Sequence, residues 1–116
     1  MSVFTEPIPD LLRGRTAVVT GGGRGIGAAV ANQLATAGAV VLVSSKTATH
    51  AQMTVDRLRE AGHIAHATTC DVSKREEVEA LQTTATSLLG KVDVLVNNAG
   101  VAFSASFLQT SLDDFL

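Results

Sequence analysis

Four short apolar runs alternate along the chain with longer segments in which apolar residues recur at helical spacing. The runs extend over Thr16 to Thr20, Val40 to Ser44, Ile64 to Cys70 and Val92 to Asn97. Apolar side chains on successive positions are typical of strands covered on both faces, as in a parallel sheet packed between helices. The pattern therefore predicts an α/β fold in which strands and helices alternate.

The segments between the runs are predicted to be amphipathic helices that cover this sheet. We expect them at Ala28 to Ala37, Thr49 to Ala61 and Ser73 to Leu89, with Gly38 and Gly62 ending the first two. The residues expected to face the sheet are Ile26, Val30 and Leu34; Met53, Leu58 and Ala61; and Val78, Leu81, Ala85 and Leu88. Ser73 and Glu76 have the spacing of a capping box that begins the third helix.

Right-handed crossovers between parallel strands predict a doubly wound sheet with the strand order 3-2-1-4. The first two helices then cover one face of the sheet, and the third covers the other. Because the strand order reverses between the first and fourth strands, their carboxyl ends are expected to open a ligand-binding crevice. We place a lead-in at residues 1–14 and a single domain at residues 15–116.

A glycine-rich loop joins the first predicted strand to the first helix. Its sequence is Gly21-Gly22-Gly23-Arg24-Gly25-Ile26-Gly27. Glycines let the backbone turn sharply and approach a ligand closely, and the helix N-terminus that follows offers unpaired N–H groups and a positive dipole. The loop therefore predicts a site for the diphosphate of a dinucleotide.

Three sequence markers occur in order: Thr20-Gly21-x-x-x-Gly25-x-Gly27, then Asp71-Val72, then Asn97-Asn98-Ala99-Gly100. Together they resemble the short-chain dehydrogenase/reductase family, and the resemblance covers about residues 13 to 116. It implies the N-terminal half of a Rossmann-type dinucleotide-binding fold.

The resemblance also implies roles for individual residues. Gly21, Gly22, Gly23, Arg24, Gly25, Ile26 and Gly27 would wrap the diphosphate and the adjoining ribose. Asp71 and Val72 would border the adenine, although Asp71 has an alternative role as the turn residue before Ser73. Asn98, Ala99 and Gly100 would line the adenosine ribose, while Asn97 would tie the central strands together.

The choice of nicotinamide cofactor can be argued from charge. Enzymes selective for NAD place an acidic residue at the end of the second strand to bind the ribose 2′-hydroxyl. Ser45 stands there instead, followed by Lys46, while Arg24 extends from the glycine loop. Two cations without a repelling carboxylate favour NADP(H) over NAD(H), the alternative being that Lys46 is an ordinary surface lysine.

Composition excludes several other classes of function. The net charge of −2, the scattered cations and the low aromatic content of 3% give no nucleic-acid interface. The single cysteine, Cys70, forms no internal disulfide and has no neighbouring base to make it a nucleophile. The three histidines have no metal-ligand spacing, so no metal is expected. Without a signal peptide or a membrane-spanning run, we expect a cytoplasmic location.

The family resemblance implies hydride transfer between a nicotinamide and a carbonyl or alcohol, with tyrosine, lysine and serine as catalytic residues. This chain contains no tyrosine. We therefore expect the catalytic set to lie beyond Leu116, no catalytic residue within the chain, and no turnover by these residues alone. A full-length form would act on a small-molecule substrate as a homo-oligomer. The alternative is a non-catalytic dinucleotide-binding module or a decayed remnant.

Overall fold

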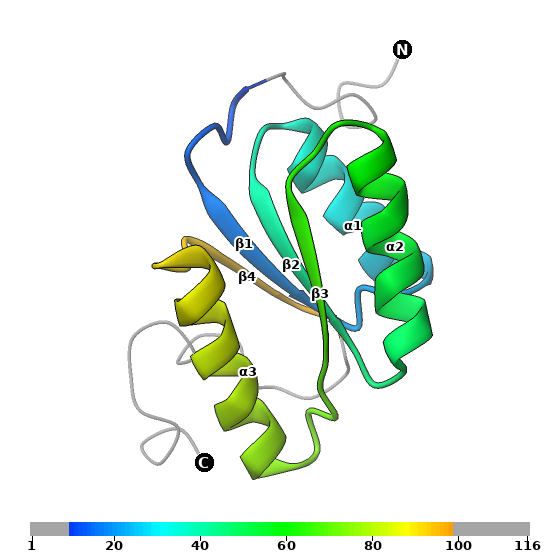
Figure 1. The fold of residues 1–116 in the computed structure, drawn as a ribbon, viewed down its shortest axis with the longest axis vertical. Helices are drawn as coiled ribbons and strands as arrows, with labels where there is room; N and C mark the ends of the chain where they lie inside the picture. The colour runs from blue at the N-terminus through cyan, green and yellow to red at the C-terminus, as the bar shows by residue number, and fades with distance from the viewer. Residues whose placement is uncertain (1–9, 99–116) are drawn as a thin grey trace.

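The computed structural model describes residues 10–98 of the chain. The elements are, in order, β1 (Thr16–Thr20), α1 (Gly25–Thr36), β2 (Val40–Ser45), α2 (Ala48–Glu60), β3 (Ala65–Thr69), α3 (Arg75–Leu89) and β4 (Val94–Asn97) (Figure 1). Every strand and helix predicted from the sequence is present. The boundaries differ from the predicted ones by at most three residues, at the start of α1.

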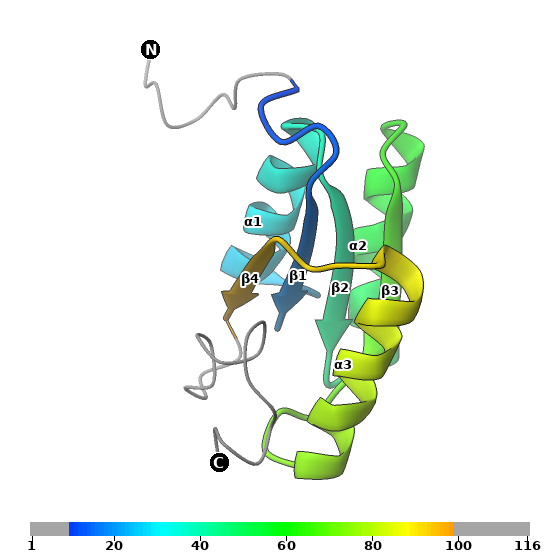
Figure 2. The same ribbon diagram turned by 90° about the vertical axis from the view of Figure 1, so that its left-hand side faces the viewer.

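The strands form one parallel sheet in the order β3-β2-β1-β4, which confirms the predicted topology. On β1, Val18 pairs with Leu42 of β2 on one side and with Leu95 of β4 on the other. Helices α1 and α2 cover one face and α3 covers the other (Figure 1, Figure 2). The carboxyl ends of β1 and β4 therefore lie together where the strand order reverses.

Two hydrophobic layers, one on each face of the sheet, hold the fold together. The first contains Val19, Val41, Val43, Ala31, Ala35, Val55 and Leu58, and the second contains Val18, Leu42, Val78, Leu81 and Ala85. Because alternate residues of a strand point to opposite faces, both layers draw on the same strands. This is why the apolar runs in the sequence are continuous rather than alternating.

The predicted buried face of α1 is wrong by one position. Its buried residues are Gly27, Ala31 and Ala35, while Ile26 is 75% exposed and Val30 and Leu34 are only half-buried. A Cβ atom added at Gly27 would collide with the Gly21 carbonyl oxygen. The helix lies too close to the loop and the sheet for large side chains, so small residues occupy its inner face.

Smaller corrections apply to the other helices. On α2, Leu58 is buried as predicted, but Met53 is 53% exposed and Ala61 lies outside the helix and is exposed. On α3, three of the predicted residues are buried, whereas Leu88 is 45% exposed and Leu89 packs against the core in its place. The residues Gly38 and Gly62 follow α1 and α2 with positive φ, as expected for helix-ending glycines.

The predicted capping box at the start of α3 is also wrong. The helix begins at Arg75, and the Ser73 hydroxyl donates to Asp71 Oδ1 at 2.6 Å instead of capping the helix. The Ser73 N–H donates to the same oxygen at 3.0 Å, and Glu77, not Glu76, accepts a hydrogen bond from the Asp71 N–H. Asp71 therefore forms the turn between β3 and α3, the alternative role that the sequence left open.

At the amino-terminal end of the strands, Asp93 fixes the register between β1 and β4. Its carboxylate accepts hydrogen bonds from the Thr16 N–H at 2.9 Å and the Thr16 hydroxyl at 3.3 Å. These bonds, above all the one from the Thr16 N–H, and the nearby Lys91 lower the pKa of Asp93 below its ordinary value. The ionised carboxylate therefore stabilises the pairing of these two strands.

Candidate functional site

The glycine-rich loop after β1 packs directly on two other elements. The Gly22 N–H donates to the Ser44 carbonyl oxygen at 3.0 Å, and a Cβ added at Gly22 would lie 2.8 Å from Val43 Cγ1. A Cβ added at Gly23 would lie 2.5 Å from His50 Cβ, in the first turn of α2. Any side chain at these positions would push the loop away from β2 and α2.

Helix α1 begins at Gly25 with a free N-terminus. Its N-cap residue, Arg24, makes no side-chain capping hydrogen bond, and the first turn contains no acidic residue. The first N–H groups of a helix have no partner within the helix, and the helix dipole adds partial positive charge at this end. The end of the loop is therefore an electropositive site suited to an anion.

Hydrogen bonds join the loop to the end of β4. The Thr20 hydroxyl lies 3.2 Å from Asn97 Oδ1 and accepts a bond from the Asn98 N–H at 3.1 Å. The Asn98 side chain donates to the Gly21 carbonyl oxygen at 3.2 Å. Asn97 thus joins the ends of β1 and β4, which is the role that the family resemblance implies. Two further residues expected at this edge, Ala99 and Gly100, lie outside the described residues.

A cavity of about 540 Å³ opens where the chain leaves β1, β2 and β3. It brings together seven of the predicted site residues: Gly21, Gly23, Arg24, Ser45, Lys46, Asp71 and Val72. Five other predicted site residues do not line the cavity. Gly22 is buried within the loop, and Asn98 lies beside Gly21. The remaining three, Gly25, Ile26 and Gly27, form the first turn of α1. The lining also includes Thr47, His50, Cys70 and Ser73, which the sequence did not nominate.

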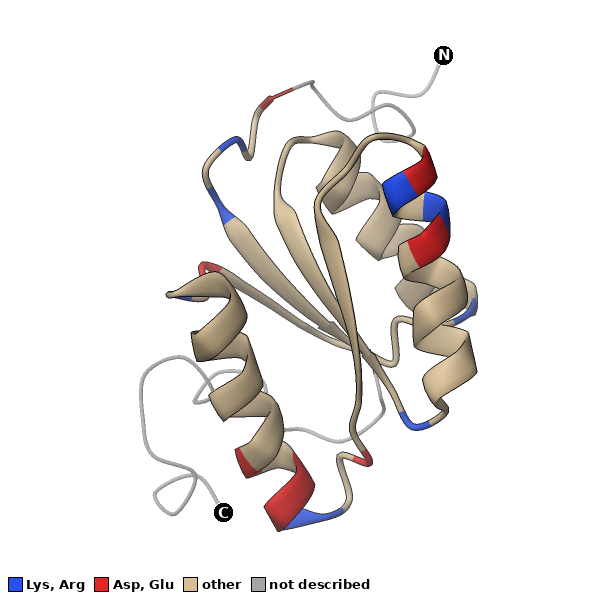
Figure 3. Ribbon diagram, viewed as in Figure 1, with Lys and Arg blue, Asp and Glu red and all other residues tan. Residues whose placement is uncertain are grey.

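The charges in this cavity differ from the expectation in one respect. Lys46 Nζ lies 3.9 Å from Asp71 Oδ2, so a carboxylate does stand beside the lysine. Among the described residues, the Lys, Arg, Asp and Glu residues lie on the helices and loops and none lies on a strand of the sheet (Figure 3). Hydrogen bonds from the Ser73 hydroxyl and N–H, with smaller effects of Lys46 and Lys74, lower the pKa of Asp71. This contact is not evident from the sequence, because the two residues lie on different loops. The Lys46 side chain is 80% exposed, and ion pairs at such exposed positions contribute little to stability.

Two other side chains in the cavity wall, Cys70 and Ser45, are not placed to act as nucleophiles. Burial, followed by the charges of Glu77 and Asp71, raises the pKa of Cys70 from 9.0 to about 11. The thiol therefore stays protonated at neutral pH and is a poor nucleophile. The Ser45 hydroxyl oxygen accepts the Thr47 N–H at 3.3 Å and so stabilises the turn that leads into α2.

Between residues 10 and 98, no three His, Cys, Asp or Glu side chains are grouped so that they could hold a metal ion. No helix in the same range combines the length and apolarity needed to cross a bilayer.

A parallel sheet with this strand order and a glycine loop at its first strand-to-helix turn define a Rossmann-type fold. Residues 15–116 match the sequence model of the short chain dehydrogenase family. The chain therefore belongs to that family.

Individual relatives agree with this assignment. A 7alpha-hydroxysteroid dehydrogenase of Escherichia coli strain K12 is 48% identical over 89 residues, which are 77% of this chain and 35% of the relative. The chain thus spans about a third of the length of this relative.

Solved structures give the same result. A 7 alpha-hydroxysteroid dehydrogenase complexed with NADH and 7-oxo glycochenodeoxycholic acid superposes with a TM-score of 0.73 and 46% identity, covering 74% of this chain and 34% of that one. A metagenomic short-chain oxidoreductase in complex with NADP has a TM-score of 0.74 and 39% identity, covering 79% and 42%.

Proposed function

We propose that this chain supplies the dinucleotide-binding part of an NADP(H)-preferring oxidoreductase, which transfers a hydride between the nicotinamide and a carbonyl or alcohol substrate. The observation that carries the proposal is that the glycine loop, the end of β2 and the turn after β3 line one shared cavity, of about 540 Å³. Family membership supports the reaction class. The similar structures in complex with NADH and with NADP support a pyridine dinucleotide as the ligand.

The loop geometry fits a diphosphate. Its backbone is pressed against β2 and α2 at Gly22 and Gly23, and the free N-terminus of α1 follows directly. In the proposed complex the diphosphate lies on residues 21–27 and the adenine lies beside Asp71 and Val72. The adenosine ribose contacts Ser45 and the segment Asn98 to Gly100.

The proposed preference for NADP(H) rests on Lys46 and Arg24, which both line the cavity. A 2′-phosphate would offer Lys46 a stronger partner than its weak, exposed contact with Asp71. A charge contact at about 4 Å is worth roughly 1 kcal/mol in water and about 4 kcal/mol near a protein surface. Each cation can therefore shift the cofactor preference about tenfold or more.

The proton-transfer groups of the reaction are proposed to come from outside this sequence. Cys70 and Asp71, two titratable residues in the cavity wall, have pKa values displaced away from neutrality in opposite directions. General acid–base catalysis works best with a group whose pKa lies near the working pH. Neither residue meets that requirement, and the chain contains no tyrosine.

Calorimetric titration of the chain with NADPH and with NADH tests the proposal. The double variant Lys46→Glu with Arg24→Ala is expected to bind NADPH about a hundredfold more weakly, while its affinity for NADH changes less than about threefold. Arg13→Glu is the matched control, because Arg13 is exposed at the amino end of the sheet, away from the cavity. Equal loss of both cofactors in the double variant would remove the basis for NADP preference. Absence of binding of either cofactor to the wild-type chain would overturn the proposed function.

A further inference from the structure

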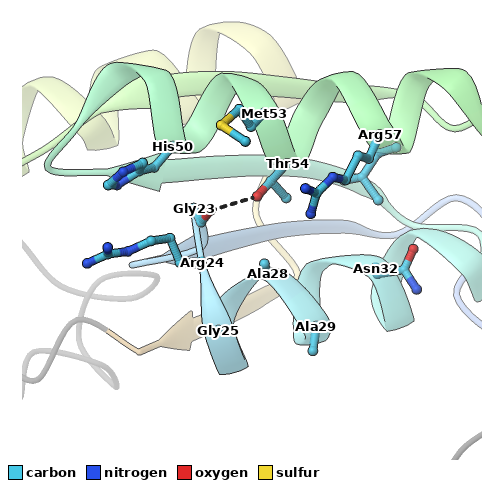
Figure 4. A pocket seen from close by; sticks show the side chains of 11 residues that line it. Gly23, Arg24, Gly25, Ala28, Ala29, Asn32, His50, Met53, Thr54 and Arg57 are labelled. Atoms are coloured by element: carbon cyan, nitrogen blue, oxygen red, sulfur yellow. Dashed lines mark hydrogen bonds between the residues drawn. The ribbon is translucent and has the colours of Figure 1, made fainter.

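Thr54 makes an unusual hydrogen bond for a threonine inside a helix. It is 4% exposed, and its hydroxyl donates to the Gly23 carbonyl oxygen at 3.2 Å (Figure 4). Helical threonines commonly bond the carbonyl four residues earlier in their own helix. Such bonds are formed here by Thr36, Thr83 and Thr86, all at exposed positions. Thr54 instead bonds a loop that lies 31 residues earlier in the sequence.

The contact lies at the floor of a second cavity, of about 620 Å³, between α1 and α2. Figure 4 shows Arg24 and His50 extending toward the same end of this cavity, with the Thr54 hydroxyl directed at Gly23 between the two helices. Gly23 packs so closely on the first turn of α2 that an added Cβ would lie 2.8 Å from the His50 carbonyl carbon. Helix α2 therefore constrains the loop both sterically and by a buried hydrogen bond.

Anchors from three elements act on three consecutive loop residues. The Asn98 side chain after β4 bonds the Gly21 carbonyl, the Ser44 carbonyl of β2 accepts the Gly22 N–H, and Thr54 of α2 bonds the Gly23 carbonyl. These three bonds use backbone groups of Gly21, Gly22 and Gly23 that point toward other parts of the protein. The N–H groups at the start of α1 are therefore the ones available to a ligand.

The Thr54 bond also determines where the next N–H group points. The Gly23 carbonyl and the Arg24 N–H belong to one peptide unit, which is trans, so they point in opposite directions. With the carbonyl held against α2, the Arg24 N–H points away from α2. Among the described residues this N–H has no hydrogen-bond partner. If the peptide rotated, a carbonyl oxygen with partial negative charge would replace a donor near the anion site.

We propose that Thr54 is a positioning residue for the diphosphate: its hydroxyl fixes the Gly23–Arg24 peptide so that the Arg24 N–H faces the ligand. This inference rests on the proposed dinucleotide function. Thr54 acts through the loop, because it does not line the cavity of about 540 Å³ in which the cofactor is proposed to bind.

The test compares two ligands by nuclear magnetic resonance titration of the chain. NADPH contains the diphosphate, whereas adenosine 2′-phosphate contains the adenine, the ribose and the 2′-phosphate without it. Thr54→Val is expected to weaken NADPH about tenfold and adenosine 2′-phosphate less than about twofold, since one hydrogen bond to the loop is lost. Thr54→Ser keeps the hydroxyl and should bind NADPH within about twofold of the wild type. Thr83→Val, which removes an exposed helical hydroxyl on α3, is the control and should bind both ligands like the wild type.

Two results would overturn the inference while leaving the proposed function intact: unchanged NADPH affinity in Thr54→Val, or equal weakening of both ligands, which indicates general damage to the fold. Should Thr54→Val show no cooperative thermal transition, Thr54→Ala makes the same comparison without placing a methyl group against the Gly23 carbonyl. Failure of NADPH to bind the wild-type chain would instead refute the proposed function, and this inference with it.

Discussion

Substituting Gly22 with alanine tests how tightly the loop is pressed against the sheet. The new Cβ would lie 2.8 Å from Val43 Cγ1 and 3.2 Å from Val19 Cγ1, and both valines are fully buried. Neither side chain can move into solvent, so the clash must be relieved by shifts of the loop or the core. Overpacking of this kind costs about 1–3 kcal/mol of unfolding free energy.

A second substitution isolates this clash. Val43→Ala removes the methyl group that Gly22→Ala meets, and by itself it costs about 1.6 kcal/mol for two buried methyl groups, plus a cavity contribution. In the double variant the alanine at position 22 occupies part of the space that Val43 leaves. The double variant should therefore be more stable than the sum of the single effects predicts, with a coupling energy of at least about 1 kcal/mol.

Urea unfolding followed by circular dichroism provides the measurement, because the chain contains neither tryptophan nor tyrosine. Val41→Ala is the matched control: Val41 is equally buried on the same face of β2, two residues, or about 7 Å, further from the loop. Gly22→Ala and Val41→Ala should add within about 0.5 kcal/mol. Additivity of Gly22→Ala with Val43→Ala, or equal coupling to both valines, would refute the close packing of the loop on β2.

Two other predictions concern ionisable groups. Cys70 should react with a thiol reagent such as dithionitrobenzoate at neutral pH only as fast as the chain unfolds, because its pKa is raised to about 11 and it is 3% exposed; rapid labelling in the native state would contradict its burial. The folded-state pKa of Asp93 lies below the ordinary value of 3.8. Its contribution to the free energy of unfolding is therefore complete above pH 3.8 and is lost as the pH falls through the folded-state pKa. Thermal unfolding should accordingly show Asp93→Asn less stable than the wild type at pH 7, with a smaller difference near pH 3, and a difference independent of pH would count against this role.

The sequence predicted the sheet well because its evidence is local. Strands buried on both faces need apolar residues on successive positions, as Val40 to Val43 and Val94 to Val96 show. The strand order followed from the handedness of crossovers between parallel strands. Both predictions required only the spacing of elements along the chain.

The predictions that failed depended on distances between elements. Hydrophobicity favours Ile26 as a buried residue over Gly27, yet the close approach of α1 to Gly21 leaves room only for the glycine. The Lys46–Asp71 contact joins two loops on neighbouring strands, and the Thr54–Gly23 bond joins a helix to a loop 31 residues away. No periodicity in the sequence indicates such contacts. The cavity residues Thr47 and His50 could have been predicted, because they follow soon after the end of β2, where the sequence already placed the site.

The assignment of cofactor roles to residues 21–27, Ser45, Lys46, Asp71, Val72 and 98–100 stays a prediction from the family resemblance. The structure adds the physical reason why the loop has its composition. Gly22, Gly23 and Gly27 are each in contact with another part of the chain at a distance that a side chain would not permit.

The small residues on the buried face of α1 determine how close the N-terminus of the helix, the proposed anion site, lies to the sheet. Gly27, Ala31 and Ala35 are buried on its inner face, and the two alanines pack in the same hydrophobic layer as Val41 and Val43 of β2. A larger side chain at Ala31 would push α1 away from the sheet and so displace the helix N-terminus on which the diphosphate is proposed to bind. The distance between the proposed ligand and the strands therefore depends on the small side chains of three buried residues, Gly27, Ala31 and Ala35.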